Sequence, residues 1–240
     1  MYKFKEAINY DHYFWWKKNL IKNMEWALLP KSSKSVFPVI ACHANSKGIA
    51  FPSEQTIAIL AGISEKTARE GIRKLEGFSS FSFDYYISNR RKRIKKYKLK
   101  LPSKENRESA FPFYKSILEG GFWHQLKNSS KAVYPVMRYF GFFDFDIYAE
   151  LEDIELEHDE YEDLFKNRNY DFCDVEINIM AQYSGLHRNS INSAIDDLEK
   201  KLLIELLKNV YGWKVFLKLD RRFDRAYLNN EILKSYRHKL

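Results

Sequence analysis

The chain of 240 residues carries 40 lysine and arginine residues against 32 acidic ones, a net charge of +8. Because 45% of its residues are apolar and 16% aromatic, it can bury packed cores, and this composition excludes an intrinsically disordered chain. It has no apolar run of about 18 residues and no signal-peptide pattern, so we expect a cytoplasmic protein without a membrane partner. Cys42 and Cys173 predict buried, reduced thiols.

The positive charge is concentrated in the first half of the chain. Residues 1–120 hold 23 lysine and arginine residues and 11 acidic ones, a net charge of +12. Residues 121–240 hold 17 and 21, a net charge of −4. This asymmetry favours a polyanion-binding site in the first half.

A repeat divides the chain into two units. Residues 26–39 recur as residues 123–136, with Trp, Leu, Ser-Ser-Lys, Val, Pro and Val matching 97 positions apart. Further on, the surroundings of Gly62 match those of Gly185, 123 positions later, so the second unit contains an insertion of 26 residues. The 97-residue offset also relates Phe14 to Phe111, and we expect an additional short helix to open each unit.

The first long helix of unit one is expected to follow the Ser-Ser-Lys motif. Ser32 or Ser33 is placed to cap it, and it runs to about Ala44. Pro38 is then expected near its first turn, where proline is tolerated better than in a helix interior.

The next two helices have clear boundary signals. Ser53 is the expected cap of the first of them, and Gly62 ends it because glycine readily adopts a left-handed backbone. Ser64 caps the following helix, at about 65–76. The positions expected to be buried are apolar or small: Ile57, Ala58, Leu60, Ala61, Ala68, Ile72 and Leu75.

This pair of helices is typical of a helix-turn-helix, whose second helix enters the major groove of DNA. We call that second helix the recognition helix. Its cap and its outward-facing side chains are the candidates for DNA binding: Ser64, Lys66, Thr67, Arg69 and Arg73.

A β-hairpin is predicted after the helix-turn-helix, with strands at 81–87 and 94–101. Such a hairpin is the wing of a winged helix, and a basic tip would contact phosphates. The alternative is an ordinary solvated charge run. The basic side chains assigned to DNA binding are Arg90, Arg91, Lys92, Arg93 and Lys95.

The second unit repeats this order, with a helix-turn-helix at 175–199 and a hairpin at 203–207 and 213–219. Asp196 and Asp197 on its recognition helix predict weaker phosphate affinity than in unit one. A degenerate unit used for packing or dimerisation is the alternative. Arginine and asparagine suit guanine and adenine edges, and the DNA-binding candidates here are His187, Arg188, Asn189, Ser190 and Asn192.

These elements predict a mainly α fold with small β-hairpins (α+β), arranged as two tandem winged-helix domains. The N-terminal domain with its basic wing spans 1–102, and a polar linker spans 103–110. The C-terminal domain spans 111–220, with the acidic insertion at about 141–173. A helical tail at 221–240 is expected to pack on the rest of the protein.

An acidic stretch lies within the insertion. Residues 144–163 hold 11 aspartate and glutamate residues and no lysine or arginine. It can be a solvated loop, a contact for a protein partner that also restrains DNA binding, or a divalent-metal site without calcium-loop spacing. The spacing of four apolar residues is also compatible with a helix: Ile147, Tyr148, Leu151 and Ile154.

The pattern of residues 29–34, 51–58, 62–67 and 72–75 resembles the helix-turn-helix domains of plasmid, phage and mobile-element replication initiators and related regulators. Unit one carries the resemblance over about 50 residues. Unit two departs from it at Val175-Glu176, where unit one has Pro52-Ser53. The resemblance implies a DNA-binding module and the tandem architecture of plasmid initiators that bind repeated origin sites.

No catalytic motif is present. The six histidines include no closely spaced pair of the kind that nicking enzymes use, and no phosphate-binding GxxxxGK[ST] loop occurs. We therefore expect no catalytic residue, no metal and no cofactor. The predicted function is sequence-specific binding of double-stranded DNA, as a replication initiator. A transcriptional regulator and a protein-assembly scaffold are the alternatives, and a homodimer is left open.

Overall fold

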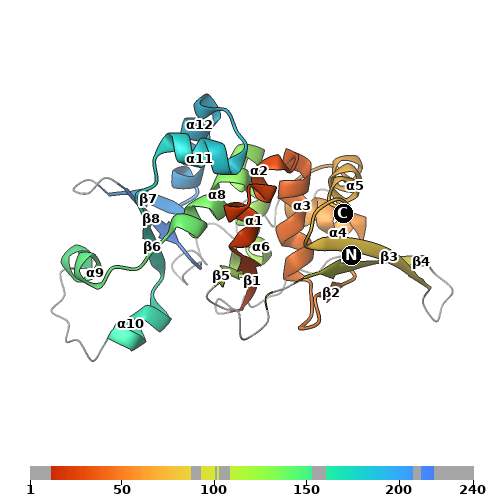
Figure 1. Ribbon diagram of the computed structural model, residues 1–240, viewed down its shortest axis with the longest axis horizontal. Helices are drawn as coiled ribbons and strands as arrows, with labels where there is room; N and C mark the ends of the chain where they lie inside the picture. Colours follow the sequence, from red (N-terminus) through yellow and green to blue (C-terminus); the bar gives the residue numbers. More distant parts are fainter. Residues whose placement is uncertain are drawn as a thin grey trace.

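The computed structural model describes residues 12–87, 93–100, 102, 109–152, 161–207 and 212–218. These residues form a mixed α+β fold in which helices occupy the middle and small antiparallel sheets lie toward the edges (Figure 1). The predicted tail and most of the predicted linker lie outside the described residues. In the part of the chain that is described, no helix is long and apolar enough to cross a membrane.

The two halves of the chain pass through the same order of elements, except that the second half has two additional helices. The first half contains β1 (Tyr13–Lys17), α1 (Asn19–Lys22), α2 (Glu25–Leu28), α3 (Lys31–Cys42), β2 (Ile49–Ala50), α4 (Glu54–Ala61), α5 (Glu65–Lys74), β3 (Phe81–Ile87) and β4 (Arg93–Leu99). The second contains β5 (Ala110–Tyr114), α6 (Ser116–Glu119), α7 (Phe122–Gln125), α8 (Asn128–Phe140), α9 (Phe145–Glu152), α10 (Tyr161–Asn167), β6 (Tyr170–Cys173), α11 (Ile177–Ser184), α12 (Arg188–Lys200), β7 (Ile204–Leu206) and β8 (Trp213–Phe216).

The described strands form three sheets. In the first half β4 lies between β2 and β3, and in the second half β8 lies between β6 and β7. The two hairpins were predicted, whereas β2 and β6, which extend each hairpin to three strands, were not. The third sheet joins the two halves, because β1 pairs antiparallel with β5.

The short helix expected to open each unit is present, but a strand precedes it. Residues 13–17 and 110–114 are strands, and each strand is followed by two one-turn helices. The β1 strand alternates buried Phe14 and Trp16 with more exposed neighbours, which is the period of a strand that covers a core on one face.

The prediction for the first long helix also needs correction. It begins at Lys31, preceded by Pro30, and neither serine caps it. Ser33 is instead buried, and its hydroxyl donates to the carbonyl of Gly71 on α5 at 2.9 Å. Pro38 lies in the helix interior, where it cannot donate a backbone hydrogen bond to the preceding turn.

The boundaries of the helix-turn-helix are as predicted. The backbone N–H of Thr56 donates to the hydroxyl of Ser53 at 3.0 Å, and that of Thr67 donates to Ser64 at 3.1 Å. Gly62 ends α4 with a φ of 62°, in the left-handed region. All seven residues expected to be buried in these two helices are buried.

The insertion contributes α9 and α10, which come between α8 and β6 in the chain and lie at the lower left of Figure 1. On α9, Ile147, Tyr148 and Leu151 pack against Tyr170 and Phe172 of β6, while Ile154 lies outside the described residues.

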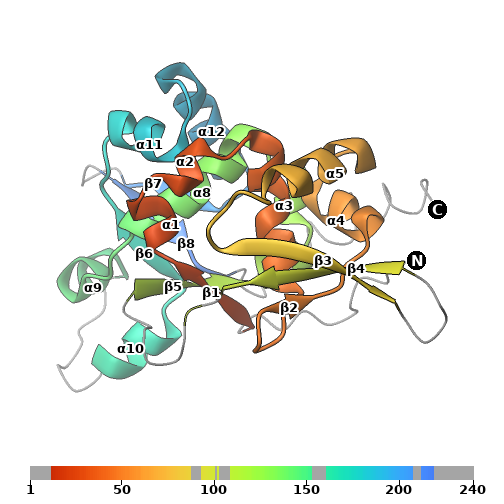
Figure 2. The same ribbon diagram turned by 45° about the vertical axis from the view of Figure 1, so that its right-hand side comes forward.

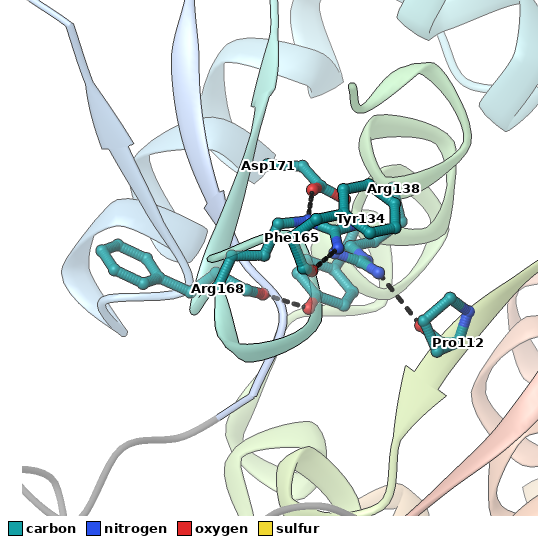
Figure 3. Close-up of polar contacts among 7 residues, drawn as sticks. Pro112, Tyr134, Arg138, Phe165, Arg168 and Asp171 are labelled. Atoms are coloured by element: carbon teal, nitrogen blue, oxygen red, sulfur yellow. Dashed lines mark hydrogen bonds and ion pairs between the residues drawn. The ribbon is translucent and has the colours of Figure 1, made fainter. Parts of the chain in front are cut away.

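A buried ion cluster fixes the end of the insertion to the core (Figure 3). Asp171 of β6 accepts from the guanidinium of Arg138 on α8 at 3.3 Å and from that of Arg168, which follows α10, at 2.6 Å. Arg138 also donates to the carbonyl of Pro112 on β5 at 3.0 Å, as Figure 3 shows.

Candidate nucleic-acid interface

The recognition helix α5 is seated on α3 by a close backbone approach. A Cβ at Gly71 would lie 2.7 Å from the carbonyl oxygen of Ser32, so only glycine fits there without a shift. With Ala68 and Ile72 it forms the buried face of α5. The opposite face is therefore presented to solvent.

Three cations predicted to bind DNA lie on that solvent face. Lys66, Arg69 and Arg73 are exposed along α5. Ser64 and Thr67 are placed differently, because their hydroxyl oxygens lie 2.8 Å apart and Ser64 accepts the N–H of Thr67. These two residues hold the start of the recognition helix.

Glu54 organises the cations, a role that the sequence did not reveal. From the first turn of α4, its carboxylate accepts from Arg69 of α5 at 2.9 Å and from Lys95 of β4 at 2.7 Å. Partial burial acts to raise the pKa of Glu54, but the two hydrogen-bonded cations outweigh it and hold the pKa below its usual value. The carboxylate thus links both helices of the pair to the hairpin.

Lys95, a predicted phosphate contact, points toward the protein. Its ammonium lies 4.7 Å from the ring centroid of Phe83 and 5.8 Å from that of Tyr85, in addition to its ion pair with Glu54. Only 15% of this side chain is exposed, so Lys95 positions the hairpin against the helices more than it offers a charge to solvent.

A hollow of about 740 Å³ separates α5 from the hairpin. Cations from α5 and β4, aromatic rings from β3 and three carboxylates line it: Glu54, Lys66, Arg69, Glu70, Arg73, Glu76, Phe83, Tyr85 and Lys95. A concave surface lined by cations can receive a phosphate backbone.

The hairpin β3–β4 extends away from the body of the protein in both views (Figures 1 and 2). Arg90, Arg91 and Lys92 belong to its tip and lie outside the described residues. Arg93 is the first residue of β4 and pairs with Ile87, whose side chain is 70% exposed. The predicted role of the tip therefore stays a prediction from sequence.

The second helix pair is built like the first. Gly185 ends α11 with a φ of 66°, and the ring of His187 accepts the N–H of Asn189 at 3.3 Å, as the capping prediction required. Arg188, Asn189 and Asn192 are exposed on α12, and Ser190 is half-buried.

Of the two aspartates on α12, only Asp196 is exposed. The carboxylate of Asp197 faces inward, where it accepts from the backbone N–H of Lys127 at 2.9 Å and from the hydroxyl of Ser130 at 2.6 Å. Asp197 thus caps α8.

Two of the lysines included in the charge count are buried. The ammonium of Lys34 donates to the carbonyl of Ala27 at 3.0 Å, and that of Lys131 donates to the carbonyl of Ala61, the last residue of α4, at 2.7 Å. Burial lowers the pKa of each to about 8. The repeated Ser-Ser-Lys motif is therefore an internal packing motif.

Among the described residues, no three histidine, cysteine or acidic side chains gather as a metal site would require. Residues 27–79 match the family model of a helix-turn-helix domain, which spans α3 to α5. No curated protein and no solved structure matches the chain. The helix-turn-helix match indicates that this protein binds DNA.

Proposed function

We propose that this protein binds double-stranded DNA in a sequence-specific manner through two winged-helix units, at 1–102 and 111–220. The observation that carries the proposal is the exposed row of Lys66, Arg69 and Arg73 on α5, inside the segment that matches a helix-turn-helix domain. The hairpin beside this helix supports the comparison with a winged helix.

In unit one, Lys66, Arg69 and Arg73 enter the major groove, where arginine can bond the O6 and N7 atoms of guanine. Glu54 keeps the guanidinium of Arg69 in place until the helix meets DNA. The wing tip at 90–93 contacts phosphates or the adjacent minor groove. Unit one supplies most of the affinity because it carries most of the cations.

In unit two, Arg188, Asn189 and Asn192 read a second DNA segment. Two asparagines favour adenine, whose N6 and N7 atoms match the amide group. With one exposed aspartate and few cations on this face, unit two contributes sequence selectivity more than affinity.

The biological role that we propose is origin binding during replication of a plasmid or mobile element. The resemblance of residues 29–75 to initiator helix-turn-helix domains supports this role. A transcriptional regulator would use the same contacts on a different arrangement of sites. The DNA that the protein selects distinguishes an initiator from a regulator.

The test is to incubate the protein with sheared DNA from its source, plasmids included, at near-physiological salt, and to sequence what it retains. We expect enrichment of short repeated elements within one region. Enrichment of a single isolated operator would support the regulator, and no enrichment at any salt concentration would overturn sequence-specific binding.

A further inference from the structure

The two halves of the chain contact each other reciprocally. The indole N–H of Trp26 donates to the carbonyl of Ala132, and that of Trp123 donates to the carbonyl of Ser35, both at 2.9 Å. Trp26 and Trp123 are 97 positions apart, and so are Ser35 and Ala132. Each half therefore donates to the other half a hydrogen bond equivalent to the one that it accepts.

The same reciprocity holds at the helix-turn-helix turns. A Cβ at Gly62 would lie 2.0 Å from the carbonyl oxygen of His124, and a Cβ at Gly185 would lie 2.0 Å from that of Ala27. The glycines are equivalent positions of the repeat, and so are Ala27 and His124. In each case the turn of one half lies against the one-turn helix of the other.

The β1–β5 ladder locates the symmetry axis. Trp15 pairs with its own equivalent, Pro112, while Phe14 pairs with Phe113 and Trp16 with Phe111. In a two-fold interface, residue i of one half contacts residue j of the other, and the equivalents of i and j make the same contact in the reverse direction. An approximate two-fold axis therefore passes through the Trp15–Pro112 pair and relates the two halves of one chain.

This interface is packed as part of one hydrophobic core that includes residues of both halves. Trp26 and Trp123 are fully buried, and α3 packs directly on α8. Figures 1 and 2 both place α5 and α12 in the upper part of the protein, with the β1–β5 ladder below them. The two recognition helices are thus fixed relative to each other, related by the axis, on one side of the protein.

We propose that a single copy of this protein reads two DNA segments in opposite orientations, as a two-fold dimer does when each subunit supplies one recognition helix. This inference rests on the proposed function. Because both helices come from one chain, no second copy is needed to occupy both segments.

The two segments must differ in sequence, because equivalent positions of the recognition helices differ. Lys66 corresponds to Asn189, Arg69 to Asn192 and Arg73 to Asp196. Cations on α5 favour guanine, and amides on α12 favour adenine. The site is therefore an asymmetric inverted pair. The two recognition helices of a two-fold dimer occupy segments whose centres lie about 10 base pairs, one helical turn, or a multiple of it apart.

The experiment selects duplexes with the full-length protein from a library with about 30 randomised base pairs, enough for two segments one helical turn apart. The selected duplex is then compared with one in which the α12 segment is reversed and with one that has about five extra base pairs, half a helical turn, between the segments. Mass photometry gives the stoichiometry of each complex.

We expect two unlike elements, one protein per duplex, and affinity reduced about tenfold or more by either rearrangement, the discrimination that one bidentate base contact provides. Arg188→Ala/Asn189→Ala/Asn192→Ala should remove only the second element, whereas Glu199→Ala/Lys200→Ala, a control at the far end of α12, should remove neither.

A single element, two elements in the same orientation, or occupation of two elements only by two proteins would overturn this inference and leave sequence-specific binding intact. Selection of no sequence at all would overturn the proposed function and the inference together.

Discussion

Gly62, which ends the first helix of the helix-turn-helix, lies against the backbone of His124 in the other half of the chain. An added Cβ at this glycine would meet the carbonyl oxygen of His124 at 2.0 Å, and the φ of Gly62 is +62°. The turn that orients the recognition helix α5 is therefore also a joint between the two halves.

Gly62→Ala should destabilise the protein strongly. A left-handed backbone costs a residue with a side chain roughly 1–3 kcal/mol, and the contact with a backbone oxygen adds to that cost. The free energy of unfolding in urea measures the effect. Gly77→Ala is the matched control, because no atom lies within 4 Å of the Cβ it would add. Equal stability of the two variants would show that the joint is not close-packed.

Glu54→Gln should reduce the decrease in the free energy of unfolding that occurs as the pH falls. The folded-state pKa of Glu54 lies below its ordinary value of 4.5, so the stabilising contribution of the carboxylate is complete above pH 4.5. It declines as the pH falls through the lowered folded-state pKa. The difference in unfolding free energy between wild type and variant should therefore be largest at neutral pH and shrink in acid. Glu199→Gln, at an exposed position, is the matched control. A constant difference for Glu54→Gln would contradict the ion pairs.

Lys131→Met should remove a dependence of the protein's stability on pH in the alkaline range. Burial lowers the folded-state pKa of Lys131 to about 8, against 10.5 for the ordinary side chain. Between these values the unfolded chain binds more protons, so this lysine makes the protein more stable as the pH rises. The stability of wild type relative to Lys131→Met should rise from pH 8 toward pH 10. The exposed Lys200→Met is the control, and a difference that stays flat would mean that the Lys131 ammonium is solvated.

Arg90→Ala/Arg91→Ala should weaken the dependence of DNA binding on salt. Each lost phosphate contact reduces the slope of log affinity against log salt by about 0.9. Lys22→Ala/Lys47→Ala removes the same charge from exposed positions on α1 and in the loop before β2. The slope, measured by fluorescence anisotropy on one duplex, should fall for the first variant only. Equal slopes for both variants would show that the hairpin tip does not contact DNA phosphates.

Local signals in the sequence determine part of this structure. Ser53, Gly62 and Ser64 mark the helix ends because caps and left-handed glycines act within a few residues. The pairing of β1 with β5 joins residues about 97 positions apart, so no local pattern shows it, and only a short helix was expected at the start of each unit.

Only part of the candidate site could likewise be predicted from the sequence. The exposed cations of α5 follow from helical periodicity, whereas the role of Glu54 depends on Lys95, which comes from a distant strand. Ser33 and Lys34 resemble capping and surface residues in sequence. Both are buried because α5 and α2 cover them, which only the packed structure shows.

The most direct test of the account compares Arg73→Ala with Lys74→Ala on the selected duplex and on an unrelated one. Both residues are exposed cations in the last turn of α5, but only Arg73 is assigned to the major groove. We predict that Arg73→Ala costs about 1–3 kcal/mol of binding free energy on the selected duplex and little on the unrelated one, and that Lys74→Ala changes both slightly and equally. Equal losses for the two variants on both duplexes would contradict base reading by α5.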